Sequence, residues 1–306
     1  MRKEAQVYSS EQRRSSFFES YNCNHPAPYI NSSRFVSAIS NNGLHRACIV
    51  GLSSACPSIA VHRNRSGSHM TSHVTFDSIC AAARRIKGHV RTTPLQPSTR
   101  MGALLGGEIW LKMENMQHTG AYKERGALNK LLSLTPEQRQ RGVCAASAGN
   151  HAQGLAYHAG RLGIPATIFM PLGTPVIKVT RTAEYGATVK LTGAGFDDSL
   201  AACLDHAAAS KSTLIHPFDD AQIIAGQGTI GLEMMDQNRH LDTLVIPVGG
   251  GGMISGIAKA AREINPKIRI VGVEPAKIPS MARFLAGDTA MQPACTTIAG
   301  KNVSCI

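Results

Sequence analysis

Four consecutive glycines, Gly249, Gly250, Gly251 and Gly252, constrain this chain more than any other stretch. The apolar run before them, residues 244–248, is typical of a β-strand, and residues 254–264 after them are apolar at helical spacing. A strand, a glycine turn and a helix start together aim several free backbone N–H groups at one point, where an anion can approach the main chain. The alternative is a tight turn of a parallel sheet with nothing bound. Because four glycines lose more backbone entropy than a turn requires, we expect this loop to bind a phosphate.

The spacing of these glycines argues against two common nucleotide sites. It is neither the G-x-G-x-x-G of a dinucleotide site nor a phosphate loop that ends in Lys-Ser/Thr. We therefore expect a phosphate ligand other than NAD or a nucleoside triphosphate.

Composition narrows the possible partners. A chain of 306 residues, 43% of them hydrophobic, can bury the core of one large or two medium domains. The formal net charge is +12, but no Lys/Arg block alternates with aromatic residues, so we expect attraction of small anions and no nucleic-acid surface. No apolar run approaches the ~20 residues of a membrane span, so we expect no membrane partner. The eight cysteines lack C-x-x-C spacing, which is typical of reduced thiols in an intracellular protein.

The N-terminal part differs from the rest in composition. Residues 1–69 are rich in Ser, Asn and Arg and poor in acidic residues. An organelle transit peptide, a disordered extension, and sequence translated upstream of a start at Met70 all fit this composition. We leave residues 1–74 outside the predicted fold and expect a cytoplasmic protein, or a mitochondrial or plastid one if the segment is a transit peptide.

From Thr75 onward, strands and helices alternate. The predicted strands are residues 108–112, 143–146, 166–170, 188–191, 213–215, 243–247 and 269–274. The predicted helices are residues 76–86, 122–134, 150–162, 175–185, 196–210, 222–237, 254–264 and 278–286. Repeated βα units predict an α/β fold with parallel sheets and helices on both faces, and ligands at the carboxyl ends of the strands.

A lysine lies at one of those strand-to-helix connections. Lys123 follows the strand 108–112 and opens a helix, where the positive end of the helix dipole disfavours an ammonium and favours the neutral amine that a Schiff base needs. The alternative is an ordinary solvated lysine in a surface run with Glu124 and Arg125. Taken alone, this motif favours the alternative.

A second loop follows the strand 143–146. Its residues are Ser147, Ala148, Gly149, Asn150 and His151. Small residues at a helix N-terminus present free N–H groups that suit a substrate carboxylate, and the Asn150 amide could hold a phenolic oxygen. His151 by itself is more often a structural histidine than a catalyst.

Together these loops resemble those of the threonine/serine dehydratases (threonine ammonia-lyases), pyridoxal 5′-phosphate (PLP) enzymes of fold type II, the tryptophan synthase β-like fold. The matching pieces, in family order and spacing, are residues 112–115, 119–127, 146–154, 216–220, 225–229 and 249–252. The resemblance runs from about residue 75 to about residue 297.

The resemblance implies two parallel-sheet βα domains with the PLP cleft between them. The large domain would combine residues 75–141 with 218–306, and the small domain would be residues 142–217. After residue 299 the sequence departs from the family, so we expect a large domain that is truncated at its C-terminus. The missing part would supply the Ser or Cys that faces the PLP ring nitrogen, and Cys305 lies in the unmatched tail.

The resemblance also implies a role for each matched residue. Lys123 would bond to the PLP aldehyde and later move the α-proton. Asn150 would hold the 3′ oxygen of the cofactor. The phosphate would be bound by Gly249, Gly250, Gly251, Gly252 and Met253, and the substrate carboxylate by Ser147, Ala148, Gly149, Asn150 and His151.

The implied reaction is β-elimination of L-threonine, and also of L-serine, to a 2-oxo acid and ammonia. The related serine racemases carry a second serine base where this chain has Ala148, so we expect elimination without efficient racemisation. The alternatives are a non-catalytic truncated form that binds PLP or a partner subunit, and another β-eliminating enzyme of the same fold. Glu274 falls at a metal-ligand position, but its acidic partner is absent, so we expect no metal. We expect a homo-oligomer if the chain is complete.

Overall fold

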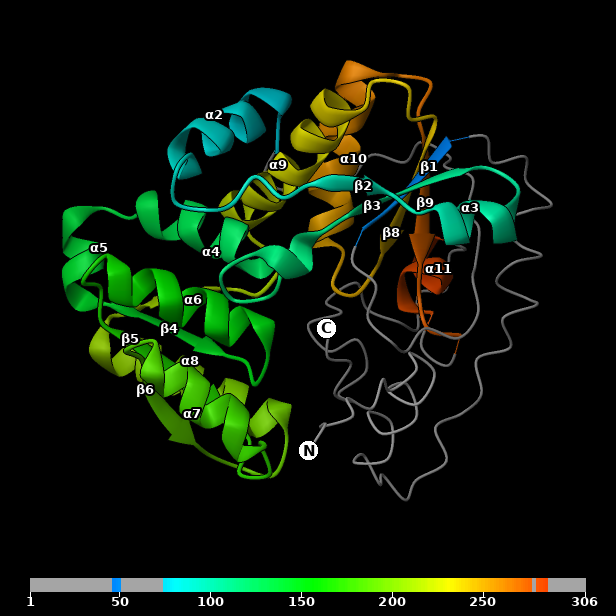
Figure 1. Cartoon of the computed structure of the whole chain (residues 1–306). Coiled ribbons are helices and arrows are strands. Elements are labelled where there is room, and N and C mark those ends of the chain that lie inside the picture. The colour runs from blue at the N-terminus through cyan, green and yellow to red at the C-terminus, as the bar shows by residue number, and fades with distance from the viewer. Residues whose placement is uncertain (1–45, 51–73, 277–278, 286–306) are drawn as a thin grey trace, which may run out of the picture. The chain divides into compact units, whose positions relative to one another are not determined.

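The computed structural model describes residues 46–50, 74–276 and 279–285, which contain two β-sheets (Figure 1). The first sheet has the order β2-β3-β1-β8-β9 and the second has the order β6-β5-β4-β7. The strands of the first are β1 (Arg46–Val50), β2 (Leu95–Pro97), β3 (Glu108–Lys112), β8 (Thr243–Pro247) and β9 (Arg269–Val273). Those of the second are β4 (Val143–Ala146), β5 (Ala166–Met170), β6 (Thr188–Leu191) and β7 (Thr213–Leu214). Every pairing is parallel except that of β2 with β3, which confirms the predicted α/β class.

Strand β1 lies in the segment that the sequence analysis left outside the fold. It pairs in parallel with β3, from Arg46 opposite Glu108 to Val50 opposite Lys112, and on its other edge with β8. The prediction that ordered structure begins at Thr75 is therefore wrong for these five residues. The run is short and its partners are far along the chain, so local periodicity could not reveal it. The rest of residues 1–73 lies outside the described residues.

The described residues also form ten α-helices and one 3₁₀ helix. They are α2 (Phe76–Ile86), α3 (Thr99–Leu105), η1 (Glu114–Met116), α4 (Lys123–Leu132), α5 (Pro136–Arg141), α6 (Asn150–Arg161), α7 (Val176–Glu184), α8 (Phe196–Ser210), α9 (Ala221–Gln237), α10 (Gly252–Ile264) and α11 (Ser280–Leu285). Thr75 caps α2, since its hydroxyl accepts from the Ser78 amide at 3.1 Å. Within the described residues, no helix combines the length and the hydrophobicity that crossing a membrane requires.

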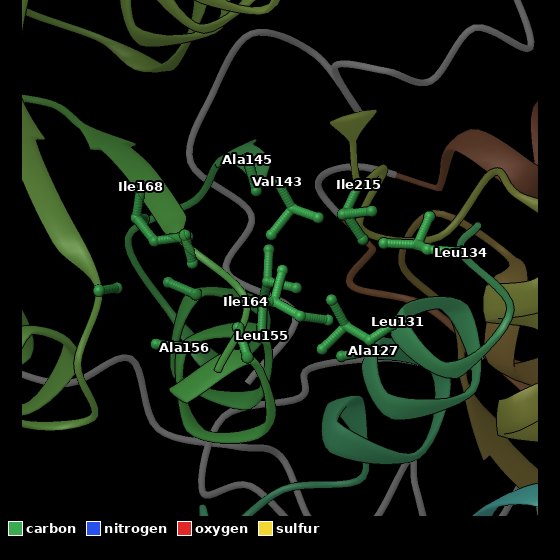
Figure 2. Packing of buried hydrophobic residues seen from close by; sticks show 14 of the residues in the cluster. Ala127, Leu131, Leu134, Val143, Ala145, Leu155, Ala156, Ile164, Ile168 and Ile215 are labelled. Atoms are coloured by element: carbon green, nitrogen blue, oxygen red, sulfur yellow. The ribbon is translucent and has the colours of Figure 1, made fainter. Parts of the chain in front are cut away.

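One hydrophobic cluster fixes α4 against α6 and the second sheet. Figure 2 shows Leu131 of α4, Leu155 of α6 and Val143 of β4 among its side chains. Full burial of a leucine stabilises a fold by roughly 1.5–3 kcal/mol, so several such residues hold the two helices firmly. Gly154 permits the close approach, because a Cβ there would lie 3.0 Å from the Glu124 Cα. The core therefore sets the start of α4, at Lys123, relative to α6, which begins at Asn150.

Helix α9 packs against α2, α4 and α10, and its N-terminus is capped by Asp220. One carboxylate oxygen of Asp220 accepts from the amides of Gln222 and Ile223 at 2.8 and 3.1 Å. The other oxygen receives the Lys130 ammonium of α4 at 2.6 Å. Asp220 thus joins the two helices in addition to starting α9.

Replacing Asp220 with alanine should lower the free energy of unfolding by about 1–2 kcal/mol, because the first amides of α9 lose their cap. Urea denaturation of the two proteins measures this difference. The neighbouring exposed Asp219 provides the matched control. Asp219→Ala should stay within about 0.5 kcal/mol of the native chain, and equal losses for both variants would contradict the capping role.

Candidate functional site

Segments far apart in the sequence line one cavity. Its lining residues are Tyr122, Lys123, Phe218, Pro247, Gly249, Gly250, Gly251, Gly252, Met253 and Ile254. The structure therefore brings the predicted lysine and the predicted glycine loop together. Tyr122 and Phe218 were not predicted as site residues, although both lie in or beside the motifs that the sequence analysis singled out.

The amine of Lys123 is buried at this cavity. The residue is the first of α4 and is only 5% exposed. Its Nζ donates to the Pro217 carbonyl at 2.7 Å and lies 5.4 and 5.9 Å from the ring centres of Tyr122 and Phe218. Glu124 and Arg125 are also fully buried, so the alternative of a solvated surface run is wrong.

The glycine loop needs its glycines on steric grounds. A Cβ at Gly250 would lie 2.2 Å from the Phe218 ring, and one at Gly252 would lie 2.5 Å from the Phe218 carbonyl oxygen. Gly251 has a φ of 85°, which side chains disfavour. Helix α10 begins at Gly252 and receives no side-chain cap, so its first N–H groups are placed to bind an anion.

The loop of residues 147–151 is held by hydrogen bonds to one of its own side chains, that of Ser147. The Ser147 hydroxyl accepts from the amides of Gly149 and Ala152, both at 3.3 Å. His151 is 3% exposed, and its Nε2 faces the Ile215 carbonyl at 3.0 Å. Burial, followed by the positive charge of Lys123, lowers the pKa of His151 to about 3. His151 is therefore a neutral side chain that bonds α6 to the end of β7.

Within the described residues, the lining of the cavity leaves out residues 147–151. The structure places Asn150 at the start of α6, partly exposed, and brings neither its amide nor Ala148 into the lining. Their contacts with the cofactor and the substrate carboxylate therefore stay predictions.

A family model for pyridoxal-phosphate dependent enzymes matches residues 86–303. The chain belongs to this family. Membership confirms PLP as the cofactor. The described residues fit the cofactor, because the buried Lys123 amine, which could bond to its aldehyde, and the glycine amides, which could bind its phosphate, line the same cavity.

Relatives of this chain include proteins that are named for their action on threonine. L-threonine ammonia-lyase of Thermotoga maritima is 48% identical over 212 residues, which cover 69% of this chain and 53% of the relative. Among solved structures, maize serine racemase is 38% identical with a TM-score of 0.68, over 70% of this chain and 65% of that one. The processed form of threonine deaminase isoform 2 from Solanum lycopersicum is 34% identical with the same TM-score, over 77% and 65%. These confirm the predicted resemblance, and the chain spans about half to two thirds of each relative.

Glu274 accepts hydrogen bonds from the main chain of α11. Its two carboxylate oxygens accept from the amides of Met281 and Ala282, each at 2.9 Å, so the side chain holds the start of α11. Among the described residues, no group of three or more His, Cys, Asp and Glu side chains is placed to hold a metal ion. Cys305 lies outside the described residues.

A buried charge network that sequence patterns did not reveal lies behind Lys123. Arg125 donates to both carboxylate oxygens of Glu114 at 2.8 Å, and to those of Glu233 at 2.7 and 2.9 Å. Lys112 donates to Glu233 at 2.6 Å. Burial alone would raise the pKa of Glu114, but the charge and hydrogen bonds of Arg125 outweigh it and hold that pKa below its usual value. The network joins α4 to β3, η1 and α9 two residues after the site lysine.

His151 should make the folding stability of the chain sensitive to acid. Its folded pKa of about 3 lies below the ordinary unfolded value of about 6.5, so its contribution to stability is complete above pH 6.5 and is lost as the pH falls toward 3. Between pH 7.5 and 4.5, this one residue should lower the free energy of unfolding by about 3 kcal/mol.

Urea denaturation at pH 7.5 and 4.5 tests the contribution of His151. His151→Gln keeps an amide donor for the Ile215 carbonyl but does not titrate, so its stability should fall less between the two pH values. His240, which is exposed, provides the control variant His240→Gln. The same acid sensitivity in the native chain and in His151→Gln would contradict the expectation.

Proposed function

We propose that this chain catalyses the PLP-dependent dehydration and deamination of L-threonine, and also of L-serine, to a 2-oxo acid and ammonia. One observation carries the proposal: the buried Lys123 amine and the glycine loop line one cavity, in a chain 48% identical to an L-threonine ammonia-lyase over 212 residues. PLP, when bound, supplies the electron sink for loss of the α-proton and of the β-hydroxyl.

The residues of this chain would divide the remaining work. Lys123 would hold the cofactor and move the proton at the substrate α-carbon, from a position fixed by the Pro217 carbonyl and two aromatic rings. The glycine loop and Met253 would bind the phosphate through main-chain amides. The amides of residues 147–151 would bind the substrate carboxylate, with Asn150 toward the 3′ oxygen of the cofactor.

We propose the domain division that the resemblance implies, with residues 142–217 as the small domain and residues 75–141 plus 218–306 as the large one, to which strand β1 adds residues 46–50. The four strands of the second sheet all fall within residues 142–217, which supports this division. Assembly as a homo-oligomer and a cytoplasmic location are part of the same proposal. The free thiols of Cys80, Cys144 and Cys203 support a reducing compartment.

The test of the proposed function is the formation of 2-oxobutanoate from L-threonine by the purified chain, with L-serine and D-serine as comparison substrates. The expected result is a 2-oxo acid from both L-amino acids, together with a visible absorbance band from PLP bound to the protein. Ala148 supports elimination over racemisation, so L-serine should give pyruvate and little D-serine. A PLP-loaded chain that releases no 2-oxo acid would refute the catalytic proposal and favour a binding role.

A further inference from the structure

The side chain of Glu124 is directed back toward the segment that precedes the site lysine. Glu124 is the second residue of α4 and is fully buried. Its Oε2 accepts from the backbone amide of Thr119 at 2.9 Å and from the Thr119 hydroxyl at 2.8 Å. Its Oε1 faces Nδ1 of His118 at 3.2 Å. Both carboxylate oxygens are thus bonded to residues that lie just before Lys123.

These bonds close residues 118–124 into a compact turn. Gly120 has a φ of 76°, and its amide donates to the Gln117 carbonyl at 3.0 Å, so the chain reverses sharply there. Buried carboxylates are strongly destabilising unless they are hydrogen-bonded. Glu124 can be buried because Thr119 and His118 in the turn provide hydrogen-bond partners for its carboxylate. The carboxylate, in turn, holds the turn in one conformation. Tyr122 and Lys123, which line the cavity, lie between the two ends of this closed segment.

The same turn is joined to α6. The His118 ring stacks on Tyr157 of α6, with ring centres 5.4 Å apart and 20° between the planes. The backbone of α4 approaches α6 closely at Gly154. Glu124 therefore connects the segment before Lys123 to α6. Residues 147–151, which we predict to bind the substrate carboxylate, lie at the start of that helix.

We propose that Glu124 is a positioning residue that holds residues 118–122, and with them the Lys123 amine, in the arrangement that the reaction requires. Glu124 is outside the lining of the cavity and acts through Thr119 and His118. This inference rests on the proposed function for its catalytic consequence. A displacement of about 1 Å at a reacting group can lower a rate about 100-fold, so loss of this contact should affect turnover strongly.

The experiment compares Glu124→Ala, Glu124→Gln and a matched control, Asn129→Ala. Asn129 is a buried polar residue of the same helix, five residues after Glu124, and its amide donates to the Gln222 carbonyl and to the Gln222 side-chain oxygen. Hydrogen exchange at the Thr119 amide reports the turn directly and requires no activity. Steady-state turnover of L-threonine and the rate at which Lys123 bonds to PLP report its consequence.

In Glu124→Ala, exchange at Thr119 should accelerate about 10-fold or more, because the amide loses a charged acceptor. The kcat for L-threonine should fall about 100-fold, and bonding of Lys123 to PLP should be slower. Glu124→Gln keeps an acceptor oxygen and should recover most of the turnover. Asn129→Ala should leave the exchange at Thr119 and the kcat near the native values.

Unchanged exchange at Thr119 in Glu124→Ala would overturn the proposal, as would faster exchange with native turnover and native PLP bonding. An equal loss in Asn129→Ala would overturn it too, since general loosening of α4 would then explain the effect. If the native chain releases no 2-oxo acid, the proposed function fails separately. The exchange rates and the PLP bonding rates then still decide whether Glu124 holds the segment.

Discussion

Replacing Arg125 with methionine is expected to lower the free energy of unfolding by about 3–5 kcal/mol. The guanidinium is fully buried and satisfies both oxygens of Glu114 and of Glu233. Methionine fills much of the volume of the arginine side chain but carries no charge. The buried Glu114 carboxylate then keeps the positive charge of Lys112 and loses that of Arg125. Since a typical domain is stable by about 5–15 kcal/mol, this loss is a large fraction of the total.

Urea denaturation measures the effect of Arg125→Met, with Arg262→Met on the exposed face of α10 as the matched control. The control should change stability by no more than about 0.5 kcal/mol. Glu114→Gln, added to Arg125→Met, removes the negative charge that has lost its Arg125 partner and should restore part of the lost stability. A loss below about 1 kcal/mol for Arg125→Met, or no recovery in the double variant, would show that the network is not a tightly coupled unit.

The predicted fold was most accurate where local signals were strong. Strands β4, β5, β6 and β8 and helix α8 have the bounds that the sequence predicts, because apolar runs there are bounded by glycines and polar turns. Helix α3 was missed because its sequence, Thr99–Leu105, contains a glycine and shows no clear apolar face. Strands β1 and β2 are defined by pairing with distant segments, and β2 is only three residues long.

The sequence predicted the residues that line the site better than the buried residues that hold them in place. The lysine and the glycines lie at strand-to-helix connections. The βα pattern places such connections together, at the carboxyl ends of the strands. The burial of Glu124 and Arg125 depends instead on tertiary partners, and Glu233 lies on a helix far along the chain. A Lys-Glu-Arg run has the composition of a solvated surface, so local reasoning favoured the wrong environment.

Replacing Lys123 with alanine should lower the kcat for L-threonine by about 1,000-fold or more, since one side chain provides both the bond to the cofactor and the proton transfer. Lys123→Arg tests the chemistry more sharply, because arginine keeps a cationic donor for the Pro217 carbonyl but does not bond to an aldehyde at neutral pH. Both variants should lose the absorbance of the covalently bound cofactor.

The matched control for Lys123 is Lys130→Ala on the same helix, where the lysine bonds to Asp220 away from the cavity. This control should keep the cofactor absorbance and most of the turnover. Borohydride treatment with PLP should label residue 123 in the native chain and in the control, and in neither Lys123 variant. Labelling at another lysine, or native turnover by Lys123→Arg, would mean that the buried amine facing the glycine loop is not the group that carries the reaction.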